Sequence, residues 1–76
     1  MHVTVARVHD NLFDGEAFKV SVPTTGGEIG ILPHHEPLVA TVKKGRLVVS
    51  HQNGEEVFDV ESGVVEVSNN QVTVIL

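Results

Sequence analysis

The chain has 76 residues, of which 41% are hydrophobic and 20% charged, with a formal net charge of −5 at pH 7 and no cysteine. This length supports one hydrophobic core, the composition is that of a folded chain, and the lack of cysteine excludes disulfides and cysteine metal sites. The acidic balance argues against nucleic-acid binding, because the phosphates of nucleic acids are bound by clustered Lys and Arg. We expect one domain over residues 1–76, whose small core favours a permanent protein partner.

Membrane insertion and export are not indicated by the sequence. No apolar run approaches the roughly 20 residues that a membrane helix needs. The N-terminus lacks the basic segment followed by an apolar segment that marks a signal peptide. We therefore expect a soluble, cytoplasmic chain with no direct membrane insertion.

Short valine-rich runs predict an all-β fold, because a branched β-carbon favours strands. Residues 18–22 alternate, which puts Phe18, Val20 and Val22 on the core side. Turn residues then divide the chain into short segments. The pattern predicts a small antiparallel β-sandwich or flattened barrel of about eight to ten short strands and no helix. The turns are expected at Asp14-Gly15, Gly26-Gly27, Pro33, Pro37, Gly45, Asn53-Gly54, Ser62-Gly63 and Asn69-Asn70.

Two hairpins are predicted in the second half of the chain. Residues 46–52 and 55–60 flank Asn53-Gly54, a dipeptide that accepts the positive φ angles of a tight turn. Residues 64–67 and 71–76 flank Asn69-Asn70, so Leu76 is expected to close the last strand. The acidic stretch beginning at Glu55-Glu56 is typical of a solvated strand edge.

The polar segment His34-His35-Glu36, between Pro33 and Pro37, has two interpretations. Imidazoles and a carboxylate are good zinc or iron ligands, so a small metal-binding β-sandwich enzyme using His34, His35 and Glu36 is one hypothesis. Adjacent residues of an extended segment point to opposite sides, however, and the prolines stiffen the loop, which favours an exposed recognition loop.

Other chemistry has weaker support in the sequence. No serine lies in a Gly-x-Ser-x-Gly elbow. Gly26, Gly27 and Gly30, which we expect between strands, lack the Lys and the following helix of a phosphate loop. A sugar- or peptide-binding module would expose aromatic platforms, but the chain has three Phe and no Trp or Tyr. We expect no catalytic residue, no bound metal and no cofactor.

Several motifs, in register along the chain, together resemble one known family. The segment Gly27-Glu28-Ile29-Gly30-Ile31-Leu32-Pro33-His34-His35-Glu36-Pro37-Leu38 resembles the G-E-x-G-I-L-P-x-H-x-P-L segment of the epsilon subunit of F-type ATP synthase. Residues 5–15 resemble that family's first strand and Phe-x-Gly turn, and residues 43–49 its Lys-x-Gly-x-Leu/Ile hairpin entry. Residues 63–67 and 71–74 resemble its Gly-x-x-Glu-Val and Val-Thr-Val ending.

This resemblance implies a non-catalytic rotor subunit of the central stalk, which couples proton flow to ATP synthesis. Its partners are then the gamma subunit and the c-ring, and its place is peripheral, at the cytoplasmic face of the membrane. The resemblance puts Glu28 and His35 near the c-ring loops. It puts Glu66 and Thr73 on a gamma-facing edge.

The sequence departs from the family pattern in three places. His34 and Glu36 stand where other residue types are commoner, which suggests a loop tuned to a different ring surface. Glu61-Ser62-Gly63 stands where Ser-Gly-Gly is usual. Family members continue into a helical hairpin that can inhibit ATP hydrolysis and bind ATP, so we expect residues 1–76 alone to do neither.

Overall fold

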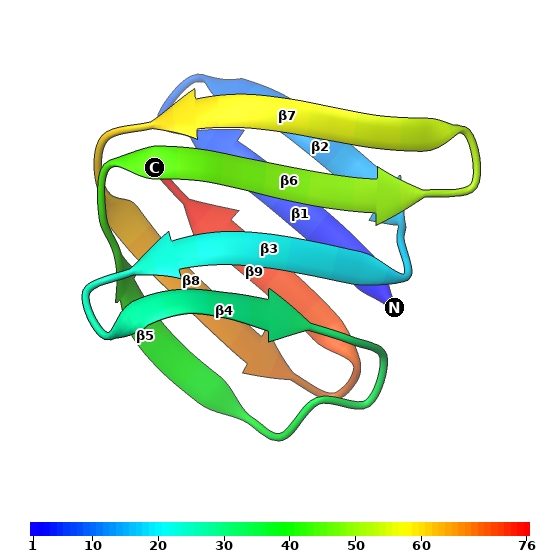
Figure 1. The fold of residues 1–76 in the computed structure, drawn as a ribbon. Coiled ribbons are helices and arrows are strands. Elements are labelled where there is room, and N and C mark those ends of the chain that lie inside the picture. Colours follow the sequence, from blue (N-terminus) through cyan, green and yellow to red (C-terminus); the bar gives the residue numbers. More distant parts are fainter.

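The computed structural model describes residues 1–76 as nine β-strands and no helix (Figure 1). This confirms the predicted all-β class and the predicted number of short strands. The strands are β1 (His2–Arg7), β2 (Asp10–Glu16), β3 (Lys19–Thr24), β4 (Gly27–Ile31), β5 (Leu38–Val42), β6 (Gly45–His51), β7 (Gly54–Val60), β8 (Gly63–Ser68) and β9 (Gln71–Ile75).

The strands form one strongly curled sheet that folds over itself into two layers. Its order is β2-β1-β9-β8-β5-β3-β6-β7, with β4 paired to β3 outside this path. Figure 1 shows β4, β3, β6 and β7 as one layer, which crosses over the layer made by the other strands. The layers join at Thr24, which pairs with Val42. Thr25 N–H donates to Thr41 O at 3.0 Å and Lys43 N–H to Pro23 O at 2.9 Å, so this corner is held on both sides.

One strand pair differs from the predicted antiparallel arrangement. β1 pairs with β9 in parallel, with Val3 opposite Val72 and Val5 opposite Val74. β1 and β9 are neighbours in one layer, where they meet after the chain has crossed to the other layer and returned through β5. Leu76 lies just beyond β9 rather than closing it, and its N–H donates to Ala6 O at 2.9 Å.

The core lies between the two layers and is built almost entirely from valine. Alternate residues of the strands point inward, so Val20 and Val22 are fully buried as predicted. Phe18 precedes β3 and is 55% exposed, so its predicted place on the core side was wrong. The buried apolar residues are Met1, Val3, Val5, Ala17, Val20, Val22, Ile31, Val42, Leu47, Val49, Val60, Val65, Val67, Val72 and Val74.

The turns confirm some predictions and correct others. Asn69 and Asn70 both have positive φ, 50° and 59°, and close the β8–β9 hairpin as predicted. In the β6–β7 hairpin His51 pairs with Gly54, so the loop residues are Gln52 and Asn53, and only Gly54 has a positive φ.

Two predicted interruptions of strands are wrong. Asp14 and Gly15 lie inside β2, where Asp14 pairs with Thr4 and Gly15 with Val3. The register shifts between Val5 and Ala6 of β1, whose partners are Phe13 and Asn11, so Leu12 of β2 is the extra residue of a bulge. Gly30, expected between strands, lies inside β4 opposite Ser21.

Candidate functional site

The loop between β4 and β5, residues 32–37, is exposed and tightly turned. His35 N–H donates to Leu32 O at 3.2 Å, and His34 has a φ of 64°, which is rare for a residue with a side chain. The segment is therefore not extended. The prediction that His34 and His35 point to opposite sides assumed an extended segment, and that assumption was wrong. Leu32 is 55% exposed at the start of the loop. The loop is therefore exposed, as the flanking prolines indicated, while its part in recognition stays a prediction; we call residues 32–37 the recognition loop for that predicted role.

His35 has a defined orientation within this loop. Its Nδ1 lies 2.7 Å from Glu36 O. Because a carbonyl oxygen can only accept a hydrogen bond, Nδ1 carries the hydrogen, and Nε2 of the neutral ring is the acceptor. The half-buried imidazole therefore has its Nε2 available to a partner.

Glu28 lies at the other end of β4 from this loop. It is exposed, and its backbone pairs with Pro23 of β3. β4 pairs with no other strand, so its second edge is free. The structure thus places Glu28 and His35 at opposite ends of one free strand edge and does not bring their side chains together.

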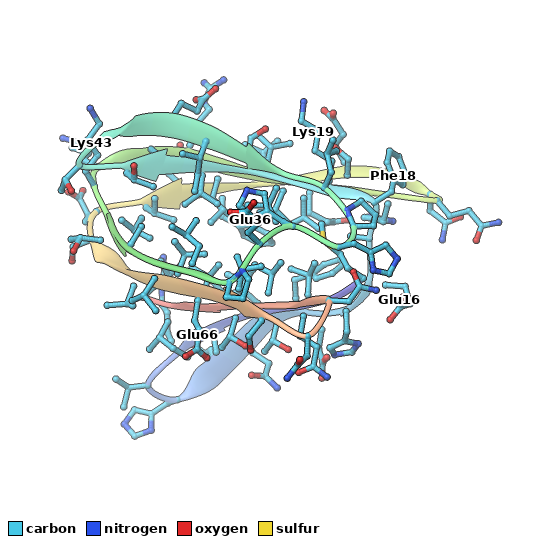
Figure 2. All side chains as sticks on the ribbon, turned by 90° about the horizontal axis from the view of Figure 1, so that it is seen from below. Glu16, Phe18, Lys19, Glu36, Lys43 and Glu66 are labelled. Atoms are coloured by element: carbon cyan, nitrogen blue, oxygen red, sulfur yellow. The ribbon has the colours of Figure 1, made fainter.

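Glu66 and Thr73 lie directly opposite each other on β8 and β9. They belong to a cross-strand row on the outside of the layer, in which Glu66 also pairs with Val39 of β5 and Thr73 with Thr4 of β1. Both strands have neighbours on each side, so Glu66 and Thr73 do not lie on an edge strand, and their place at a gamma-facing surface stays a prediction. Figure 2 shows Glu66 on the outside of its layer. No cation lies within ion-pair distance of its carboxylate.

Three large apolar side chains share this outer face. Val39 is 69% exposed, Val64 47% and Ile75 51%. Val64 pairs with Ile75, and Val39 pairs with Glu66, so the apolar groups lie beside the carboxylate. We call this surface, made of Val39, Val64, Glu66, Thr73 and Ile75, the outer β5–β8–β9 face. The apolar members were not predicted, although they occupy the outward positions of the same alternation that buries their neighbours.

A cleft of about 500 Å³ opens beside this face, between β4 and the part of β5 that does not pair with β3. Ile29 lines it from β4, Leu38 and Ala40 from β5, and Val64 from β8. The cleft exists because β3 and β5 meet only near Thr24, after which the two layers diverge. The free edge of β4 and the outer β5–β8–β9 face are therefore separated only by a groove with a partly apolar lining.

The comparisons with known proteins agree on one family. The model of the ATP synthase delta/epsilon chain β-sandwich domain matches residues 1–76. The chain belongs to this family. The resemblance inferred from the motifs is thereby confirmed, and the family is one of ATP synthase subunits.

Relatives of the chain share its sequence over its whole length. The ATP synthase epsilon chain of Neisseria meningitidis serogroup C is 43% identical over 77 residues, covering 99% of this chain and 55% of the relative. The epsilon chain of Delftia acidovorans is 40% identical over 76 residues, with the same coverage. The chain thus spans about half the length of the curated relatives that it matches.

Solved structures share the fold. A chain in the cryo-EM structure of the Euglena gracilis mitochondrial ATP synthase, with OSCP, F1 and c-ring, has a TM-score of 0.88 at 24% identity, covering 96% of this chain and 48% of that one. A chain in the central stalk and c-ring structure of the Tetrahymena thermophila mitochondrial ATP synthase has a TM-score of 0.85 at 16% identity, covering 99% and 61%. Both likenesses support the epsilon-type sandwich as a fold.

The metal-enzyme hypothesis finds no support in the geometry of this epsilon-type domain. No three His, Asp or Glu side chains come together in an arrangement that could hold a metal ion. Nδ1 of His35 donates to a backbone carbonyl, and His34 sits on a left-handed turn beside it. His34, His35 and Glu36 therefore act as parts of a loop and not as a ligand set.

Two of the other histidines of the domain, His51 and His2, make local contacts. Nε2 of His51 lies 3.2 Å from Glu56 Oε2, while its Nδ1 accepts Asn53 N–H at 3.2 Å, which fixes the β6–β7 turn. Nε2 of His2 lies 2.6 Å from Asp14 Oδ1 across the β1–β2 pair. No helix of the chain has the length and apolar character that crossing a membrane requires.

Proposed function

We propose that this chain is the sandwich domain of a non-catalytic rotor subunit in the central stalk of a proton-translocating ATP synthase. It contacts the gamma subunit and the c-ring and couples proton flow to ATP synthesis. It lies peripherally at the cytoplasmic face of the membrane that holds the ring. Membership of the delta/epsilon chain family and the match to epsilon chains over 99% of this chain support the proposal.

The gamma contact uses the outer β5–β8–β9 face. The observation that carries the proposal is the exposure of three large apolar side chains, Val39, Val64 and Ile75, on this one face. A small domain with such a face gains stability when a partner covers it. Covering apolar surface contributes on the order of 25 cal/mol per Å² before the costs of association. Glu66 and Thr73, in the middle of this face, then fix the register through polar contacts.

The c-ring contact includes Glu28 and His35. Because these residues flank the free edge of β4, a contact that includes both runs along that edge. An exposed carboxylate such as Glu28 contributes little affinity at such a rim, roughly 0 to 1 kcal/mol, and acts mainly on register, and we expect a similarly modest contribution from the half-buried His35. The coupling effect of either residue is therefore expected to be larger than its effect on binding.

A pair of substitutions on opposite layers tests the gamma contact. Val64→Glu introduces a charge into the outer β5–β8–β9 face and should weaken the complex with the gamma subunit at least about tenfold, which is 1.4 kcal/mol. Val57→Glu is the matched control, because Val57 is 52% exposed on β7, in the other layer. Size-exclusion chromatography and titration with purified gamma subunit measure both. Equal weakening by the two variants, or no complex of the unchanged chain at micromolar concentrations, contradicts the assignment.

The c-ring contact is tested in membranes that carry the complete ATP synthase. Glu28→Gln and His35→Ala, singly and together, should reduce proton pumping per ATP hydrolysed while the chain remains bound and folded. Glu55→Gln is the control, since Glu55 is an exposed carboxylate on the edge strand β7. Unchanged pumping in the double variant would remove both residues from the contact.

A further inference from the structure

The recognition loop is tied to the β8–β9 hairpin by one side chain. Asn70 Oδ1 accepts the N–H of His34 at 2.9 Å, across 36 residues of sequence. Its backbone oxygen accepts His2 N–H at 3.2 Å, so Asn70 itself is fixed to the start of β1. No other hydrogen bond joins residues 32–37 to the rest of the chain; the remaining ones, His35 N–H to Leu32 O and His35 Nδ1–H to Glu36 O, lie inside the loop.

Both residues that form this contact, Asn70 and His34, have a positive φ. Asn70 has a φ of 59° in the tight β8–β9 turn, a conformation that asparagine and glycine tolerate and most side chains do not. Glycine at this position could close the same turn but would offer no side-chain oxygen. His34, with a φ of 64°, turns its N–H toward the hairpin. Asparagine therefore meets two requirements at once, the turn and the acceptor.

The contact joins the two surfaces of the proposed function. On one side the loop presents His35, whose Nδ1–H bond to Glu36 O sets the direction of its ring. On the other side Asn70 lies between β8 and β9, the strands that carry Glu66 and Thr73. Displacement of the loop relative to the hairpin would change the distance between the two proposed contact surfaces without unfolding either.

We infer that Asn70 is a positioning residue that holds the recognition loop, and with it His35, in a fixed place relative to the outer β5–β8–β9 face. The inference rests on the proposed function for its consequence in the motor, but the hydrogen bond itself can be tested without the motor. Loss of the acceptor removes the one hydrogen bond that joins the loop to the hairpin, so the position of His35 relative to the outer β5–β8–β9 face is no longer fixed by it.

Three substitutions separate the acceptor from the turn. Asn70→Gly keeps the left-handed turn and removes the acceptor, whereas Asn70→Asp keeps an oxygen at the same place. Asn69→Gly is the matched control, because Asn69 shares the turn and the positive φ, 50°, but its side chain makes no hydrogen bond. Urea denaturation should give nearly the same midpoint for Asn70→Asp, Asn69→Gly and the unchanged chain, and should lower the midpoint of Asn70→Gly by no more than the loss of one hydrogen bond, since the hairpin ladder is unchanged.

The first measurement is amide hydrogen exchange of the 76-residue chain. Exchange of the His34 amide should be about three to ten times faster in Asn70→Gly, as expected from loss of one net hydrogen bond. Asn70→Asp and Asn69→Gly should leave it within about twofold of the unchanged chain. An equal rate in Asn70→Gly and the unchanged chain overturns the inference, whatever the function of the protein.

The second measurement is proton pumping by ATP synthase membranes that carry the variants. Asn70→Gly should reduce coupling as His35→Ala does, and Asn70→Asp should restore it. If His35→Ala reduces pumping and Asn70→Gly does not, the positioning role is refuted while the proposed function stands. If neither reduces pumping, the c-ring contact of His35 fails and the positioning role falls with it, even where the exchange result confirms the hydrogen bond.

Discussion

Gly63, the first residue of β8, offers a quantitative test of the fold. Its φ is 153°, which a residue with a side chain rarely adopts. A methyl group at this position would overlap the carbonyl oxygen of Ile75 and lie 3.1 Å from Leu76 Cα. Both atoms belong to the backbone, so they cannot move aside without displacing the end of β9. We therefore expect Gly63→Ala to be among the most destabilising small substitutions in the domain.

The magnitude follows from two separate costs. A strained backbone conformation costs of order 1–3 kcal/mol, and forcing a group into occupied space typically costs about 1–3 kcal/mol more. The sum, about 2–6 kcal/mol, compares with a total stability of about 4–11 kcal/mol for a chain of this length, at roughly 0.05–0.15 kcal/mol per residue. Gly63→Ala thus removes a large share of the folding free energy.

Two other glycines separate these costs. Gly54 has a φ of 121° with no atom within 4 Å of an added methyl, so Gly54→Ala should show the backbone cost alone. Gly30, in β4, lacks the positive φ, and its added methyl meets only Lys19 Cε at 3.5 Å, so Gly30→Ala should change stability by less than about 1 kcal/mol.

Urea denaturation followed by circular dichroism gives the free energy of unfolding of the unchanged chain and the three variants. The expected order of stability is Gly30→Ala, then Gly54→Ala, then Gly63→Ala, with similar dependence on urea concentration. If Gly63→Ala is no less stable than Gly54→Ala, the overlap with β9 contributes nothing and the reasoning is refuted.

Two further substitutions probe the layer junction and the core. Thr24 is 3% exposed, and its Oγ1 donates to Gly27 O at 2.6 Å and accepts Gly26 N–H at 3.2 Å, so Thr24→Val should lower the free energy of unfolding by about 1–3 kcal/mol, with exposed Thr25→Val as a neutral control. Leu47 is fully buried, so Leu47→Ala should cost about 2–5 kcal/mol by the same urea measurement, whereas Val48→Ala, half-buried on the outside of β6, should cost much less. If a variant and its control lose equal amounts of unfolding free energy, the interpretation that this pair tests is contradicted.

The sequence predicted those features that depend on neighbours along the chain. Alternation around Val20 and Val22 predicts one buried side because successive side chains of a strand point to opposite faces. Asn69-Asn70 predicts its hairpin because the turn needs positive φ at both positions. Asp14-Gly15 misleads for the same reason: the local preference for a turn is outweighed by pairing with β1, which only the folded sheet supplies.

Features that join distant segments could not be predicted in this way. The parallel contact of β1 with β9 depends on the path of the chain through the other layer and back, and the bond from His34 to Asn70 depends on where two turns meet. At the candidate site, the family motifs indicated four residues one by one, which are Glu28, His35, Glu66 and Thr73. Only the register shows that Glu66 and Thr73 are direct partners, whereas Glu28 lies near the start of β4 and His35 in the loop after its end.

The free strand edges give one further argument for a partner along β4. The sheet has three free edges, at β2, β4 and β7, and a free edge invites pairing with another chain unless charge protects it. β2 carries Asp10, Asp14 and Glu16, and β7 carries Glu55, Glu56 and Asp59. β4 carries only Glu28, beside two glycines and two isoleucines. The least protected edge is therefore the one that faces the groove and ends at the His35 loop, as expected if a partner covers it in the assembled protein.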